Sequence, residues 1–255
     1  MNQKSDYIAV FDSGVGGISV LRHLIKQMPK ERFLYYGDSA NAPYGTKTVA
    51  QVRELSVAVA EKLLEQGIKA LVVACNTATA AAVDLLREKY PQLIVVGIEP
   101  AVKLAADKFP GGTVGVMATP LTTDSEKLHA LEARWQEKCN IIPLPTPGLV
   151  ELVEAGKAVS KESEALLKPM LAPYADKLDA VVLGCTHYPF AAATIQALLG
   201  EGTVLLDGGE GTARETQRRL AAENLCNDGD GEILIQSSAE DPEMIQRCWE
   251  LLKVE

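Results

Sequence analysis

Short apolar runs alternate along the chain with longer segments in which apolar and polar residues mix at helical spacing. Most of the runs are continuously apolar, which is typical of strands covered on both faces. Segments such as 49–66 and 210–224 predict amphipathic helices. This alternation predicts an α/β fold with a mostly parallel sheet. The predicted strands are 8–12, 33–37, 70–75, 93–98, 113–118, 140–144, 179–184, 203–206 and 232–235.

The succession of predicted strands is similar in the two halves of the chain. Strands end near residues 12, 38 and 75 in the first half and near 119, 146 and 185 in the second, and VVACNTA aligns with VVLGCTH. We therefore expect two similar open α/β domains. The first comprises 1–98 plus 208–255, because the last stretch reads as helix, strand and helix and is expected to return to the first half. The second comprises 99–207.

The composition narrows the function classes. The chain has 255 residues, of which 47% are hydrophobic and only 5% aromatic, which suits helices on parallel strands better than a β-sandwich. A net charge of −9 without a Lys/Arg run argues against nucleic acid. No stretch approaches a membrane span, and the N-terminus lacks a secretory signal. Five cysteines, an odd number, then indicate free thiols in the cytoplasm. No metal is expected, since C-x-x-C and H-x-x-x-H pairs are absent and there are three histidines.

Open α/β sheets bind ligands at the carboxyl ends of their strands, which selects FDSGVGG, GDSANAPYG, ACNTATA, MATPLTT and GCTHYP. DSGVGG lacks the third glycine of a dinucleotide fingerprint but suits an anion. Its Asp12 is either a helix cap or a functional group. GDSANAPYG is either a surface loop or a ligand contact in which Tyr44 lends a hydroxyl and Gly45 an N–H group.

Two cysteines occupy matching positions. A lone cysteine is usually a small core residue. Cys75 and Cys185, however, each follow a predicted strand and precede a predicted helix start, where a thiolate is stabilised. His187 lies two residues after Cys185 and is a candidate base or orienting group. The remaining cysteines have no such setting and are expected to be structural: Cys139, Cys226 and Cys248. The remaining histidines fall in helical patterns and are expected to lie on the surface: His23 and His129.

Two thiols on two similar halves are compatible with several chemistries. A disulfide exchanger usually has its thiols close in sequence, and a single nucleophile needs only one. Two acid–base groups suit a reaction on both faces of one carbon, in which one thiolate removes a proton and the other thiol delivers one. General acid–base catalysis then requires each thiol to titrate near the working pH.

The motifs FDSGVGGISVL, YYGDSANAPYGTK, VVACNTATA and VVLGCTHYPF resemble those of glutamate racemases in the aspartate/glutamate racemase superfamily. The resemblance extends from Ile8 to about Leu220. It implies two α/β domains related by a pseudo-twofold axis, with the active site at their interface. It also implies cofactor-independent interconversion of L- and D-glutamate, which supplies D-glutamate for peptidoglycan. The oligomeric state varies in the family, and a homodimer is one of its assemblies.

The resemblance assigns roles to individual residues. Cys75 takes the α-proton from D-glutamate and Cys185 from L-glutamate, with Asp12 and His187 as supporting groups. Glu151 and Glu154 both suit an additional supporting glutamate, and Glu154 is preferred because V-E-x-G aligns better. The implied substrate contacts are Asp12, Ser13, Tyr44, Gly45, Asn76, Thr77, Thr119, Thr122, Thr186 and His187.

The sequence departs from the family at two places. Gly208 and Gly209 stand where a serine or proline is expected near a helix start, which affects only a peripheral cap. Some relatives carry an N-terminal extension associated with activation by a cell-wall precursor. Here the first strand starts near Ile8, so we expect no such control.

The chemistry is demanding because the α-proton is weakly acidic and no cofactor serves as an electron sink. Hydrogen-bond donors must therefore stabilise the developing carbanion. Alternatives remain open at this point: a racemase for aspartate or a hydantoin, a two-lobed amino-acid-binding module, and a thiol–disulfide protein. The Thr186–His187 pair favours glutamate over aspartate.

Overall fold

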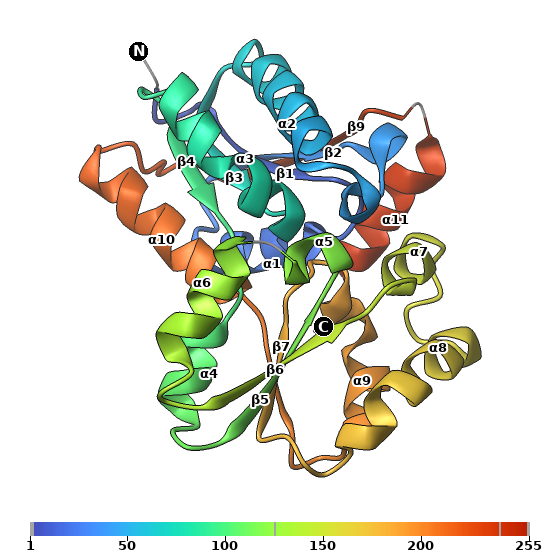
Figure 1. Cartoon of the computed structure of the whole chain (residues 1–255). Helices are drawn as coiled ribbons and strands as arrows, with labels where there is room; N and C mark the ends of the chain where they lie inside the picture. Colours follow the sequence, from blue (N-terminus) through green and yellow to red (C-terminus); the bar gives the residue numbers. More distant parts are fainter. Residues whose placement is uncertain (1–2, 125, 240, 254–255) are drawn as a thin grey trace. The chain divides into compact units, whose positions relative to one another are not determined.

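The chain forms two compact units, described here from a computed structural model that covers residues 3–124, 126–239 and 241–253. Unit 1 comprises Met1–Ile98 and Gly209–Glu255, and unit 2 comprises Glu99–Gly208. Each unit is built on its own parallel sheet (Figure 1). Among the described helices, none has both the length and the apolar character needed to cross a membrane.

Unit 1 contains a five-stranded parallel sheet in the order β4-β3-β1-β2-β9. β9 lies beside β2, with Phe33 opposite Ile233, so the C-terminal stretch contributes a strand to the sheet of the first half. The strands are β1 (Tyr7–Asp12), β2 (Arg32–Gly37), β3 (Ile68–Val73), β4 (Ile94–Gly97) and β9 (Glu232–Ser237).

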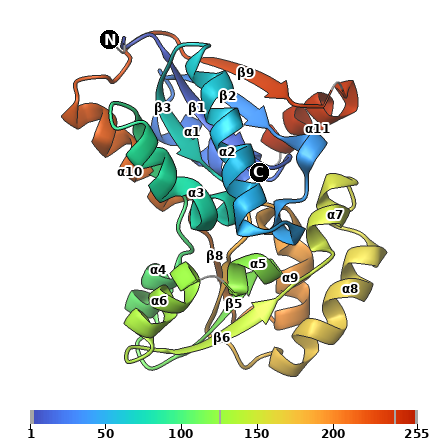
Figure 2. The ribbon, with the colours of Figure 1, turned by 45° about the horizontal axis from the view of Figure 1, so that its top comes forward.

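Helices cover both faces of this sheet. α2 packs against α3 on one face, and α1 packs against α10 and α11 on the other (Figure 2). Two short 3₁₀ turns follow β2. The elements are α1 (Ile18–Gln27), η1 (Ser39–Asn41), η2 (Tyr44–Thr46), α2 (Val49–Leu64), α3 (Asn76–Lys89), α10 (Gly209–Ala222) and α11 (Pro242–Leu252).

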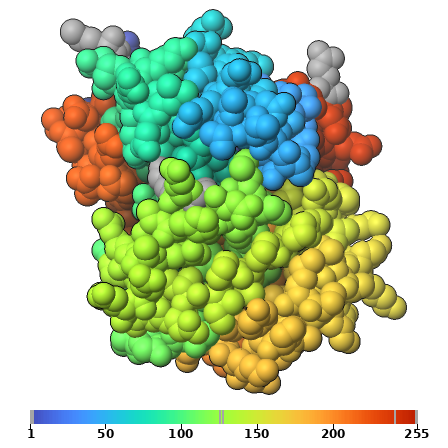
Figure 3. Space-filling view, viewed as in Figure 1, coloured from blue at the N-terminus to red at the C-terminus, as the bar shows by residue number. Residues whose placement is uncertain are grey.

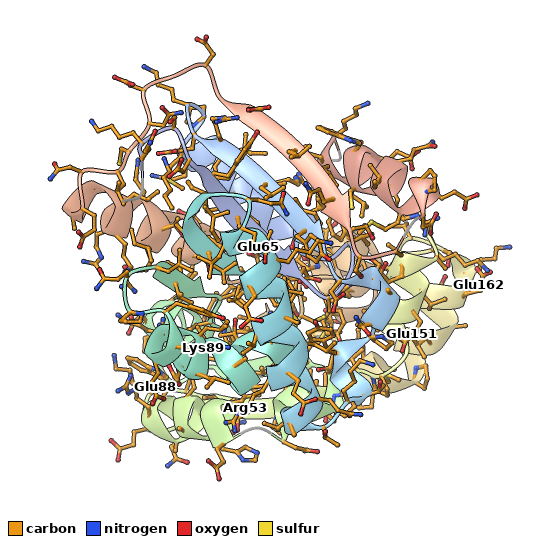
Figure 4. The ribbon with its side chains drawn as sticks, turned by 90° about the horizontal axis from the view of Figure 1, so that it is seen from above. Arg53, Glu65, Glu88, Lys89, Glu151 and Glu162 are labelled. Carbon is orange, nitrogen blue, oxygen red and sulfur yellow. The ribbon has the colours of Figure 1, made fainter. Side chains whose placement is uncertain are left out.

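Polar contacts hold α3, which begins at the candidate thiol, against α2. Arg53 Nε on α2 donates to the carbonyl oxygen of Ala81 at 2.8 Å. Lys89 Nζ at the end of α3 lies 2.7 Å from Glu61 Oε1. Figure 4 shows Arg53 and Lys89 on these neighbouring helices. The exposed pair adds little stability, but the two contacts hold α3 against α2 near its middle and at its C-terminal end.

Unit 2 has a four-stranded parallel sheet in the order β6-β5-β7-β8. α4 packs with α6 on one face, and α8 with α9 on the other; the surfaces of α8 and α9 adjoin in Figure 3. The strands are β5 (Thr113–Ala118), β6 (Asn140–Pro145), β7 (Ala180–Leu183) and β8 (Val204–Leu206). The helices and turns are α4 (Val102–Lys108), α5 (Pro120–Thr123), α6 (Glu126–Trp135), α7 (Leu149–Glu154), α8 (Lys161–Leu171), η3 (Ala172–Tyr174), η4 (Tyr188–Ala191) and α9 (Ala192–Leu199).

Four strands have the same order in both units. Numbered by their succession within a unit, they run fourth, third, first, second: β4-β3-β1-β2 and β8-β7-β5-β6. The repeat predicted from the sequence is therefore confirmed at the level of topology, as is the fold class of two parallel-sheet α/β domains. In such sheets the crevice opens where the strand order reverses, between the first and third strands. Each unit thus has one favoured ligand position at the carboxyl ends of β1 and β3 or of β5 and β7.

An ion pair is buried at the opposite end of the unit 1 sheet. Lys69 on β3 is fully buried, and its Nζ lies 2.6 Å from Glu31 Oε2. The same ammonium group donates to the carbonyl oxygens of Lys4 and Leu225, while Glu31 Oε1 accepts the backbone N–H of Asn227 at 2.8 Å. The pair therefore ties the N-terminal segment, β3 and the segment that leads into β9 together.

Candidate active site

Cys75 lies at the switch point of unit 1, two residues after the end of β3. It is the N-cap residue of α3, and its Sγ accepts the backbone N–H of Ala78 at 3.4 Å. The predicted strand was therefore too long, because Cys75 turns its side chain to the first turn of α3. The partial positive charge of a helix start favours a thiolate at this position.

Asp12 and Ser13 lie beside this thiol at the end of β1. Ser13 Oγ is 3.7 Å from Cys75 Sγ. Asp12 is fully buried, and its Oδ1 accepts the backbone N–H of Gly14 at 3.0 Å. Its interpretation as a helix cap is wrong, because α1 begins only at Ile18, with Gly17 as its N-cap. A Cβ on Gly17 would lie 2.6 Å from Asp12 Cβ, so this glycine allows α1 to approach the carboxylate.

Asn76 and Thr77 are the first residues of α3 and are both buried. Asn76 Oδ1 is a buried acceptor for which no hydrogen-bond partner is found among the described residues. Buried polar groups are nearly always satisfied, so such an acceptor beside a thiol suits a ligand that donates a hydrogen bond.

Tyr44 opens the turn η2 and is only 1% exposed, so it does not lie on a surface loop, and that interpretation of its position is wrong. Its hydroxyl donates to Asp38 Oδ2 at 2.6 Å, and its ring meets Phe11 edge-on at 6.1 Å. Burial, followed by the hydrogen bond to Asp38, raises the pKa of Tyr44 far above its usual range, so the phenol stays protonated. Gly45 follows and is half-buried.

Cys185 holds the corresponding position in unit 2. β7 ends at Leu183, and the N–H of Gly184 donates to the carbonyl oxygen of Met117 on β5 at 2.7 Å. The expected α-helix start after Cys185 is wrong: the 3₁₀ turn η4 intervenes and α9 begins only at Ala192. Pro189 lies in this turn, and proline lacks the N–H group that a helix interior needs.

His187 links the second thiol to a carboxylate. Its Nδ1 lies 3.7 Å from Cys185 Sγ, and its Nε2 lies 2.6 Å from Glu154 Oε1 at the end of α7. Burial alone lowers the pKa of His187, but the contacts with Cys185 and Glu154 outweigh it and raise this pKa well above its ordinary value. Of the two candidate glutamates, the structure thus brings Glu154 to the histidine, whereas Glu151 is exposed on α7 (Figure 4).

The threonines of unit 2 lie at the same edge of its sheet. Thr119 follows β5, and its Oγ1 lies 3.1 Å from Thr122 Oγ1. Thr186 lies between Cys185 and His187, and all three threonines are buried. They place hydroxyl groups on both sides of the switch point between β5 and β7.

The other thiols and histidines lie elsewhere. Cys139 and Cys248 are buried in the cores of units 2 and 1, and Cys226 is half-buried, as expected for structural residues. All five cysteines belong to the described part of the chain, and none forms a disulfide. His129 is exposed and His23 half-buried. No group of metal-ligating side chains occurs within residues 3–124, 126–239 and 241–253.

The sequence matches the Asp/Glu/Hydantoin racemase family over residues 10–216, more than half of its length. The chain belongs to this family. It is 46% identical to a glutamate racemase from Clostridium acetobutylicum, over 99% of each chain. Among solved structures it is similar to glutamate racemase from Francisella tularensis in complex with D-glutamate (28% identity, TM-score 0.86, 99% of this chain and 95% of the other). It is also similar to the Escherichia coli enzyme in complex with L-glutamate and the activator UDP-MurNAc-Ala (35% identity, TM-score 0.86, 97% and 94%).

Asp38 is the buried polar residue of this region that the sequence reasoning missed. It stands in the selected segment GDSANAPYG, directly after β2, but the motif gave no sign that its carboxylate is buried and bonded to Tyr44. The only available signal was its position at the carboxyl end of a strand.

Proposed function

We propose that this protein interconverts L- and D-glutamate by a two-thiol, two-base mechanism that needs no cofactor. One observation carries the proposal: each unit places a cysteine after the third strand of the same four-strand order, at the switch point of its sheet. The full-length relatives that bear the name glutamate racemase support glutamate as the substrate.

In this mechanism Cys75 acts as the base toward D-glutamate and Cys185 toward L-glutamate. The thiolate removes the α-proton from one face of the α-carbon, and the C–H electron pair passes into the α-carboxylate. The other thiol then delivers a proton to the opposite face. Each turnover therefore leaves the two thiols in exchanged protonation states, ready for the reverse reaction.

The supporting groups differ between the two thiols. Ser13 Oγ and the N–H of Ala78 contact Cys75 and stabilise a thiolate there. His187, held by Glu154, carries a proton beside Cys185 and stabilises a thiolate by its charge. Asp12, buried next to Cys75, supports the first thiol and is a candidate partner of the substrate's ammonium group.

The developing carbanion needs hydrogen bonds to the α-carboxylate. The donors proposed for the substrate are hydroxyl, amide and backbone N–H groups rather than arginines. They belong to Ser13, Gly45, Asn76, Thr77, Thr119, Thr122, Thr186 and His187. Tyr44 is a further proposed substrate contact, but its hydroxyl proton is donated to Asp38, so its oxygen is left as an acceptor. We further infer that the product D-glutamate is supplied to peptidoglycan synthesis in the cytoplasm.

Racemisation followed by circular dichroism tests the substrate assignment. We expect L- and D-glutamate to converge to zero ellipticity, and L-aspartate and a chiral hydantoin to keep their signals under the same conditions. A faster decay with aspartate or the hydantoin would contradict the glutamate assignment. Binding without any change in ellipticity would instead indicate a binding module.

Replacing Glu154 with glutamine tests the contact between Glu154 and His187. Glu154 is one cause of the raised pKa of His187, so its loss lowers this pKa. The protonated histidine persists until the pH rises through its pKa, so the basic limb of the pH profile of kcat/KM should move to lower pH in Glu154→Gln. We expect kcat to fall about tenfold, equivalent to ~1.4 kcal/mol.

Glu151→Gln is the matched control for this experiment, because Glu151 lies on the same helix but is exposed. It should keep the rate and the pH profile of the unaltered protein. Equal effects of the two substitutions would show that the contact between Glu154 and His187 is not used in the reaction.

A further inference from the structure

Asp38 is a buried carboxylate at the carboxyl end of β2. It is 2% exposed, and its backbone N–H donates to the carbonyl oxygen of Asp12 at 2.9 Å. It therefore lies beside the end of β1, next to the residues proposed to support Cys75. It is not among the residues to which the resemblance to glutamate racemases assigns a role.

The partners of this carboxylate are neutral. Tyr44 Oη donates to Oδ2 at 2.6 Å, and Asn41 Nδ2 donates to Oδ1 at 3.0 Å and to Oδ2 at 3.2 Å. No Lys, Arg or His forms an ion pair with Asp38 among the described residues. Burying a carboxylate without a positive partner is unfavourable. If the contacts of Asp38 only stabilised the fold, a neutral amide side chain at this position would serve as well.

The other acidic groups that act electrostatically on Tyr44 are Cys75 and Asp12. This end of the unit 1 sheet thus gathers Asp12, Asp38 and a thiol around one phenol. A buried carboxylate without a positive partner departs from the usual rule that buried charges are paired, and such departures are expected at functional sites.

The hydrogen bond to Asp38 fixes what the phenol can do. The hydroxyl group has one proton, which Asp38 accepts, so the oxygen offers only lone pairs to any further partner. Glutamate at neutral pH has one group that donates hydrogen bonds, the α-ammonium, because both of its carboxylates are acceptors. The phenol oxygen can therefore meet this substrate only at its ammonium group.

We propose, building on the glutamate racemase function proposed above, that Asp38 is a positioning residue that holds the Tyr44 hydroxyl proton so that the phenol oxygen accepts a hydrogen bond from the substrate's α-ammonium group. The carboxylate charge also polarises the phenol and strengthens this acceptor. In Asp38→Asn the amide can donate to the phenol oxygen instead. The hydroxyl proton then turns toward the substrate and opposes the ammonium group.

A double-mutant cycle on L-glutamate racemisation tests this proposal. Asp38→Asn and Tyr44→Phe are each expected to raise KM about tenfold and to change kcat by less than about threefold. The double variant should also show a rise of about tenfold, because Asp38 acts through the Tyr44 hydroxyl. An unchanged KM in Asp38→Asn, or a hundredfold rise in the double variant, overturns the proposal. If Asp38→Asn does not fold, an unchanged KM in Tyr44→Phe overturns it.

Asn41→Ala is the control for loop order, since Asn41 binds the same carboxylate but has no proposed contact with substrate. It should leave KM within about twofold of the unaltered protein. A KM as high as in Asp38→Asn would show that the loop, and not the direction of the hydroxyl group, sets affinity. Absence of glutamate racemisation by the unaltered protein would overturn the proposed function itself, an outcome distinct from those of the cycle.

Discussion

Replacing Cys75 or Cys185 with alanine is expected to lower kcat for glutamate racemisation by at least about a thousandfold, because each removes one of the two proton-transfer groups. D-glutamate should still bind, since the hydroxyl and amide donors around each thiol remain. Circular dichroism measures the rate, and calorimetric titration measures binding.

Cys248→Ala and Cys139→Ala are the matched controls for the two thiols. Both residues are buried cysteines, one in each unit, and neither lies at a switch point. We expect these variants to racemise glutamate at nearly the rate of the unaltered protein. A comparable loss of rate in either control would indicate an effect of cavities on folding, and near-normal turnover in Cys75→Ala or Cys185→Ala would refute the assignment of two bases.

Replacing Lys69 with methionine is expected to lower the free energy of unfolding of unit 1 by about 3–5 kcal/mol, because it leaves the Glu31 carboxylate buried without its positive partner. Urea denaturation followed by circular dichroism measures the change. Replacing both residues, as in Lys69→Met with Glu31→Gln, should restore part of the stability, since no unpaired charge is then buried.

Lys157→Met is the control for this prediction, because Lys157 and Glu162 form an exposed pair at 2.9 Å in unit 2. Its unfolding midpoint should be almost unchanged, as is usual for surface pairs. Equal midpoints for Lys69→Met and Lys157→Met would show that the buried pair does not stabilise the return of the C-terminal segment.

The strands could be predicted because buried parallel strands are continuous apolar runs. Each of the nine predicted strands is present, and the errors lie at the ends. β3 begins at Ile68 and includes Lys69, whereas the predicted strand begins after this lysine, at Ala70. In sequence, a lysine within a strand indicates an exposed edge. Only the fold shows that Glu31 and two carbonyl oxygens compensate the buried charge of Lys69.

The candidate site residues could be predicted where they directly follow the ends of strands. Cys75 and Cys185 were selected as candidates because the motif repeats, and the structure places both at the switch points of their sheets. The preference for Glu154 over Glu151 agrees with the contact to His187. The bond between Asp38 and Tyr44 was not predictable, because a buried and an exposed carboxylate in a loop look alike in sequence. The turn after Cys185 was also missed, although Pro189 gave a signal for it.

Isotope content at the α-carbon during racemisation in deuterium oxide tests the two-base mechanism most directly. The thiol that delivers the proton has exchanged with solvent, so D-glutamate formed early from L-glutamate should carry deuterium at Cα while the remaining L-glutamate still carries hydrogen. Mass spectrometry of the separated isomers gives both values. Early D-glutamate that retains the substrate's own hydrogen would show that a single base serves both faces, and would contradict the roles assigned to Cys75 and Cys185.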